Sequence, residues 1–108
     1  MEQQLLDLRQ EMLAASGGFI EAQQAYLAAA DPPAKQSEEV LKLAAENCLQ
    51  AAKPYEEALL KFEQYLLAAE PSDQIAEELG HVEQFLDALG RETKAISKLA
   101  AHHAKAAQ

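Results

Sequence analysis

The sequence has very few of the residues that favour β-strands. Its 108 residues include 2 Val, 3 Ile, 1 Thr and no Trp. β-Branched and aromatic residues are the ones enriched in strands, so a protein built mainly of sheets is excluded. Ala and Leu, with 23 and 16 copies, are strong helix formers instead, as are Glu, Gln and Lys. The composition therefore predicts an all-α protein.

Basic residues are also scarce. Lys and Arg together number 9 against 18 Asp and Glu, which gives a formal net charge of −9. Nucleic acids and anionic membranes attract cationic surfaces, so neither is expected as the main partner. No Gly-rich phosphate loop, paired-carboxylate site or Ser/His/Asp set can be recognised. We therefore expect no catalysis, no cofactor and no small-molecule substrate.

The single cysteine, Cys48, cannot form an internal disulfide, which makes a reducing compartment the default expectation. Its position on an apolar stripe predicts a buried residue. No apolar run reaches the ~20 residues that cross a bilayer. The first residues, Met1-Glu-Gln-Gln-Leu-Leu-Asp, lack the basic and apolar regions of a signal peptide. Together these features favour a cytoplasmic protein.

Two proline-containing segments divide the chain into three. Asp31-Pro32-Pro33 and Glu70-Pro71-Ser72-Asp73 combine helix-capping residues with prolines, which disfavour helix at the preceding position. Ser37, followed by two glutamates, is a second possible start for the middle helix. Helices are expected over about residues 2–30, 34–69 and 73–105. Short connections make neighbours antiparallel, so residues 1–108 are predicted to form one domain, an up-down-up three-helix bundle.

Apolar residues recur at alternating spacings of three and four in all three segments. Such a heptad pattern marks one buried face on each helix and is typical of coiled-coil packing. In the first segment the pattern comprises Leu5, Leu8, Met12, Ala15, Phe19, Ala22, Tyr26 and Ala29. A second row, one position further along the chain, is expected to widen this core face: Leu6, Leu13, Ile20 and Leu27.

Five residues inside the segments are potential helix breakers: Gly17, Gly18, Pro54, Gly80 and Gly90. The phase of the apolar pattern is unchanged across all of them, which predicts continuous helices with a kink at Pro54. The string Leu89-Gly90-Arg91 also has the pattern of a helix C-terminus, so a break there stays an alternative. In the antiparallel register four of them fall near one height of the bundle: Gly17, Gly18, Pro54 and Gly90. We therefore predict a bend or hinge at that height.

Two strings contain histidines at spacings that known sites use. Glu78-Leu79-Gly80-His81 holds one Glu-x-x-His pair, which di-iron bundles use twice. No second pair exists in the chain and His81 points away from the apolar stripe, so a surface histidine is the preferred interpretation. The spacing of His102 and Lys105 on a helix loosely resembles that in histidine phosphotransfer domains. The pair His102-His103 is nevertheless expected to be a polar helix end. A metal or phosphotransfer site stays a remote alternative.

Several leucines of the middle segment fall outside its apolar stripe: Leu43, Leu49, Leu60 and Leu67. Leu60 and Leu67 are seven residues apart on one outward side, and they offer a second seam for helix packing. The expected function is therefore non-catalytic: a scaffold, adaptor or chaperone-like bundle that binds a protein partner or a second copy of itself, as an oligomer. The alternative is an amphipathic bundle that binds a lipid or hydrophobic particle surface.

Overall fold

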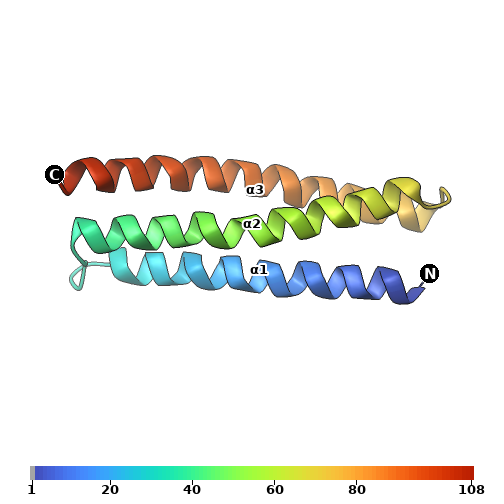
Figure 1. The fold of residues 1–108 in the computed structure, drawn as a ribbon, viewed down its shortest axis with the longest axis horizontal. Coiled ribbons are helices and arrows are strands. Elements are labelled where there is room, and N and C mark those ends of the chain that lie inside the picture. Colours follow the sequence, from blue (N-terminus) through green and yellow to red (C-terminus); the bar gives the residue numbers. More distant parts are fainter. Residues whose placement is uncertain (1) are drawn as a thin grey trace.

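The computed structural model describes residues 2–108 and contains three helices, with no strand in that range. α1 spans Glu2–Ala30, α2 spans Glu38–Ala68 and α3 spans Asp73–Ala106. α2 runs antiparallel to both neighbours and lies between them, in a rod of 54 × 20 × 18 Å (Figure 1). The two chain ends lie at opposite ends of this rod. The predicted all-α, up-down-up three-helix bundle is confirmed.

α2 begins at Glu38, four residues later than the predicted boundary at residue 34. The N-cap is Ser37, whose hydroxyl accepts a hydrogen bond from the backbone N–H of Val40 at 3.3 Å. Residues 31–37 form a turn and irregular chain, and Ser37 has extended backbone (φ −64°, ψ 160°), so the helix begins only after it. The second possible start, at Ser37, is the one that the chain uses.

The helices continue through every predicted breaker: Gly17, Gly18, Pro54, Gly80 and Gly90 are all helical. Pro54 is exposed, so water can reach the carbonyl group one turn earlier, for which proline supplies no N–H. The ribbon of α2 changes direction near its middle (Figure 1). The phase of the apolar pattern was therefore a correct guide to helix continuity. Movement at this height stays a prediction.

Gly90 does not end α3, and a neighbouring side chain bonds the backbone at this point. The hydroxyl of Thr93 lies 2.9 Å from the carbonyl oxygen of Leu89 and 3.1 Å from that of Gly90, and it donates to this pair. The alternative of a helix C-terminus at Gly90 is wrong. Bonding of a Thr hydroxyl to the preceding turn is common inside helices.

The core runs along α2, which packs against both other helices (Figure 1). Its buried cluster comprises Leu8, Phe19, Ala52, Leu59, Phe62, Leu66, Val82 and Leu89. α2 is the largest contributor because it is the one helix with a neighbour on each side. Cys48 is 1% exposed, which confirms its predicted place in the core.

Leu59 and Leu60 provide a matched test of this core. Leu59 is 0% exposed, whereas the next residue, Leu60, is 42% exposed. We expect Leu59→Ala to lower the free energy of unfolding by about 2–5 kcal/mol, because it leaves a cavity beside Phe62 and Leu66. Leu60→Ala is expected to change it by about 0.5 kcal/mol or less. Urea unfolding followed by circular dichroism measures both, and equal losses would contradict this core.

Candidate interaction surface

α1 and α3 both pack against α2 but not closely against each other. Within residues 2–108, no Cα atom of α1 lies within 8 Å of a Cα atom of α3. Long polar side chains bridge the two helices: Arg9 pairs with Glu78, and the amide of Gln23 donates to Glu92 Oε2 at 2.9 Å. We call the strip of surface that runs along both helices, on the side away from α2, the groove.

The open side of α1 carries a row of large aliphatic side chains, here called the α1 stripe: Leu6, Leu13, Ile20 and Leu27. These side chains are 47%, 65%, 48% and 64% exposed, respectively. The prediction that this row widens the core is therefore wrong. At 100° per residue the stripe lies about 100° around the helix from the Phe19 row. Only a closely packed α3 could cover it, and α3 is too far away.

Two apolar side chains of α3 border the same groove. Leu99, 39% exposed, lines a cavity of about 140 Å³ together with Leu27 of the α1 stripe. Phe85, 43% exposed, is seven residues from both Glu78 and Glu92, two of the α3 residues that contact α1. Because residues seven apart share one side of a helix, Phe85 also faces the groove. The α1 stripe, Phe85 and Leu99 together are called the groove surface below.

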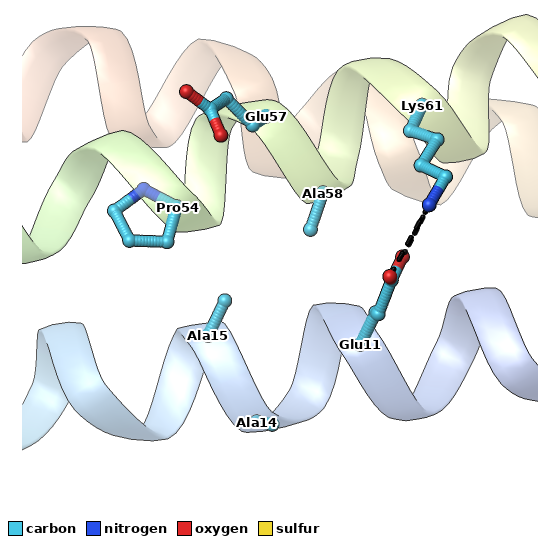
Figure 2. A pocket seen from close by; sticks show the side chains of 7 residues that line it. All are labelled: Glu11, Ala14, Ala15, Pro54, Glu57, Ala58 and Lys61. Carbon is cyan, nitrogen blue, oxygen red and sulfur yellow. Dashed lines mark hydrogen bonds and ion pairs between the residues drawn. The ribbon is translucent and has the colours of Figure 1, made fainter.

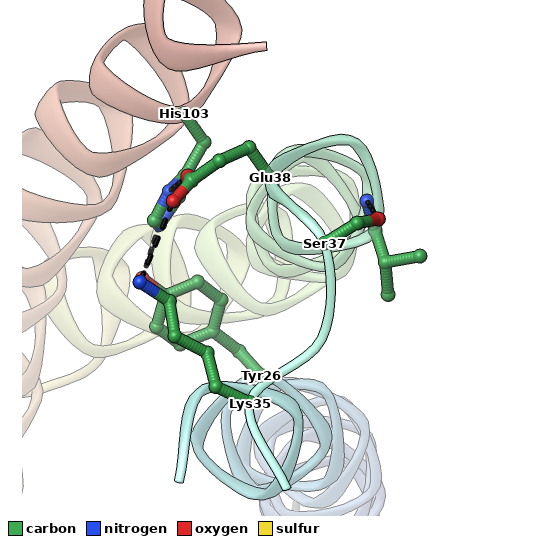
Figure 3. A network of polar contacts seen from close by, with 6 residues as sticks. Tyr26, Lys35, Ser37, Glu38 and His103 are labelled. Carbon is green, nitrogen blue, oxygen red and sulfur yellow. Dashed lines mark hydrogen bonds and ion pairs between the residues drawn. The ribbon is translucent and has the colours of Figure 1, made fainter. Parts of the chain in front are cut away.

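A hydrogen-bonded cluster joins all three helices beside this cavity (Figure 3). The ring of His103, which is 6% exposed, lies between Tyr26 of α1 and Glu38 of α2. Its Nε2 is 2.7 Å from the Tyr26 hydroxyl, and its Nδ1 is 2.5 Å from Glu38 Oε2. A carboxylate can only accept, so Nδ1 donates to Glu38, and a neutral ring accepts the Tyr26 hydrogen at Nε2. We call these three residues the polar clasp.

The polar clasp was not predicted from the sequence. A polar helix end is correct for His102, which is exposed, but wrong for His103, which is buried. One signal was present, because His103 follows the apolar residue Ile96 by seven positions and thus continues the buried stripe of α3. Its partners lie 77 and 65 residues away in the chain, and only the assembled bundle brings them together.

The groups near the polar clasp are poor nucleophiles. Burial raises the pKa of the Tyr26 hydroxyl, and the charge of Glu38 raises it further. Burial also raises the pKa of the Cys48 thiol, which lines the neighbouring cavity. Both groups keep their protons at neutral pH, whereas covalent catalysis needs the deprotonated form. The arrangement fits a structural fastening of three helices better than a reaction centre.

The predicted leucines of α2 do not form one surface. Leu43, Leu60 and Leu67 are 52%, 42% and 64% exposed, whereas Leu49 is half-buried. Leu43 lies ~26 Å along the helix from Leu60, at 1.5 Å per residue. Leu60 and Leu67 remain a pair near the α2–α3 connection, far from Leu43. Their part in binding stays a prediction.

An open cleft between α1 and α2 surrounds Pro54 (Figure 2). Pro54 and Ala58 of α2 point toward Ala15 of α1, and the cleft has a volume of about 510 Å³. At one side Lys61 Nζ lies 3.2 Å from both carboxylate oxygens of Glu11. These two charges already neutralise each other, and few other polar groups converge on the cleft. It therefore lacks the features of a small-molecule site.

The carboxylate of Glu78 of α3 is engaged by Arg9 of α1, and His81 lies in solvent, as predicted. In the part of the chain that the structure describes, no three His, Cys, Asp or Glu side chains are grouped to hold a metal ion. Among the same residues, no helix has the length and apolarity needed to cross a bilayer.

Comparisons with protein-family models, with curated proteins and with solved structures found no match for this chain. The function must therefore be inferred from the geometry of the chain itself. Of its features, the polar clasp and the core are explained by the folding of a single chain. The groove surface is not, because its large apolar side chains remain in solvent.

The polar clasp predicts a particular response to acid. The hydrogen bond from His103 holds the pKa of Glu38 below its usual value near 4.5, and Lys35 lowers it further. Because this pKa is lower in the folded than in the unfolded chain, Glu38 contributes stability above about pH 4.5. That contribution is lost as the pH falls through the folded pKa.

We therefore expect the Tm of the unmodified chain to fall more steeply than that of Glu38→Gln between about pH 6 and pH 3. Thermal melts followed by circular dichroism measure this difference. Glu46→Gln is the matched control, because Glu46 is exposed on the same helix. Parallel curves for the unmodified chain and Glu38→Gln would show that the polar clasp adds no acid-sensitive stability.

Proposed function

We propose that this protein is a non-catalytic interaction module that docks a helix of another polypeptide on its groove surface. The α1 stripe carries the proposal: four large aliphatic side chains, each at least 47% exposed, lie in heptad register. They extend over ~31 Å of helix at 1.5 Å per residue. Single exposed leucines are ordinary, but a row of four large aliphatic side chains is typical of a binding surface, and a heptad row is how helices pack together.

The groove has the geometry that accepts a fourth helix. α1 and α3 run parallel to each other, and the contacts Arg9–Glu78 and Gln23–Glu92 hold them at a fixed separation. An amphipathic helix laid along the groove would touch both, with its own side chains spaced by three and four residues. The product is a four-helix packing, a common way to bury such faces. Scaffolds, adaptors and chaperones all use surfaces of this kind.

A lipid or hydrophobic particle surface is the second candidate, since the α1 stripe could also lie on it. Helices that bind at lipid interfaces carry Lys and Arg on the polar face, often with Trp. α1 has a single basic residue, Arg9, which is already paired with Glu78, and the chain has no Trp. The net charge of −9 adds repulsion from anionic lipid. These features favour a polypeptide as the ligand.

Site-specific photo-crosslinking tests this function. Leu13 is 65% exposed on the α1 stripe, and Gln50 is exposed on α2 outside the groove surface. A benzophenone side chain is placed at each position in turn, and the native host cells are irradiated. We expect a covalent adduct with a polypeptide from Leu13 and none from Gln50.

The adduct also identifies the class of ligand. A product of twice 11.8 kDa contains a second copy of the chain, and any other protein product contains a different partner. Adducts with lipid would support the second candidate and count against the first. Equal yields from Leu13 and Gln50 would mean that the groove surface has no special role.

A further inference from the structure

The α1 stripe is symmetric about its own midpoint. The outer pair, Leu6 and Leu27, and the inner pair, Leu13 and Ile20, are both centred between residues 16 and 17. If α1 of a second copy packs antiparallel on this stripe, Leu6 of each copy lies opposite Leu27 of the other. In the same way, Leu13 of each copy lies opposite Ile20 of the other. The same patch then serves both chains, as a two-fold interface requires.

α3 places its exposed aromatic residue at the same height. The bridging contacts Arg9–Glu78 and Gln23–Glu92 each join residues that are 69 apart in the chain. With this offset, the midpoint of the α1 stripe lies level with Phe85, which is 43% exposed. A two-fold axis at the midpoint therefore brings Phe85 close to its own copy. Aromatic side chains near the centre of an interface are typical anchors of binding.

Gly17, at the midpoint, has no packing role within one chain. A Cβ atom added there would meet no atom within 4 Å. The same is true of Gly18, Gly80 and Gly90, so the space alone does not single out Gly17. Gly17 lies about 40° around the helix from Leu13 and about 60° from Ile20, where a missing side chain lets a second helix approach closely.

The rows of α1 on either side of the stripe contain one acidic residue, Glu2. One row comprises Gln3, Gln10, Gly17 and Gln24, and the other comprises Glu2, Arg9, Ser16, Gln23 and Ala30. The chain has 18 acidic residues and a net charge of −9, so two copies repel each other over most of their surface. Like-charge repulsion is reduced along these two rows of α1, because most of their side chains are uncharged. In the antiparallel pairing each row faces its own copy, and glutamine amides can both donate and accept.

We propose that the occupant of the groove surface is a second copy of this chain, in an antiparallel two-fold dimer. The α1 stripes pack on each other, and Phe85 lies beside its copy. A single helix face ~31 Å long and ~10 Å wide covers ~300 Å². Adding the α3 edge with Phe85 and Leu99 raises this to ~600 Å², which is at the lower end of the ~600–1,000 Å² per partner of a standard interface. This inference rests on the proposed function and names its partner.

Sedimentation equilibrium of the purified chain at micromolar concentrations is the first test. The unmodified chain is expected at twice 11.8 kDa. Leu13→Glu with Ile20→Glu introduces like charges beside the axis, so the dissociation constant should rise at least ~100-fold while circular dichroism stays helical. Leu60→Glu with Leu67→Glu is the matched control, because these leucines are also exposed and seven residues apart. That control should remain dimeric.

The outcomes separate this proposal from the wider function. A dimer broken by the Leu60 and Leu67 changes, but not by those at Leu13 and Ile20, would overturn the groove surface as the dimer contact. A chain that stays monomeric throughout would overturn the second copy as occupant. In that case, a photo-adduct at Leu13 with a different protein would still support the proposed function.

Disulfide crosslinking tests the antiparallel orientation, in a Cys48→Ala background. Gly17→Cys lies at the axis, so mild oxidation should link two copies. Leu27→Cys should not link to itself, because the two copies of Leu27 are ~31 Å apart along the helices at 1.5 Å per residue. An equal mixture of Leu6→Cys and Leu27→Cys chains should crosslink. Self-linkage of Leu27→Cys with no linkage in Gly17→Cys would overturn the antiparallel arrangement.

Discussion

The packing of α2 against two neighbours is the constraint on which the rest of this structure depends. Leu59 and Phe62 are 0% and 1% exposed, and they lie on adjacent rows of the same helix. This wide apolar face needs a helix on each side, and α1 and α3 supply them (Figure 1). Because the two outer helices meet α2 on different rows, their Cα atoms stay more than 8 Å apart within the described residues. The groove is thus a consequence of how the core is covered.

The open side of the bundle is maintained by polar contacts and not by apolar packing. Arg9–Glu78 and Gln23–Glu92 span the groove at two heights, and the polar clasp joins Tyr26 to His103 near one end. Such side chains are long enough to bridge helices that cannot interlock. They position α3 without covering the α1 stripe. The exposed α1 stripe and the polar contacts between α1 and α3 therefore result from the same arrangement of the three helices.

Much of the fold follows from local patterns. The three helices, their antiparallel order and their continuity through Pro54 and Gly90 were predicted, because heptad phase and capping residues act within a few turns. The start of α2 differed because two capping signals competed, and Ser37 was the one used. The candidate surface was predicted less well. Leu60 and Leu67 were correctly placed in solvent, but the longer exposed row on α1 was assigned to the core.

The sequence by itself determined where helices form, where they end and which residues share a row, since periodicity is a property of one helix. It also contains the even spacing of Leu6, Leu13, Ile20 and Leu27. Only the tertiary structure decided which rows are covered, because burial depends on the angle at which other helices approach. The same holds for His103, which continues an apolar row in the sequence. Its burial depends on Tyr26 and Glu38, which reach it from two other helices.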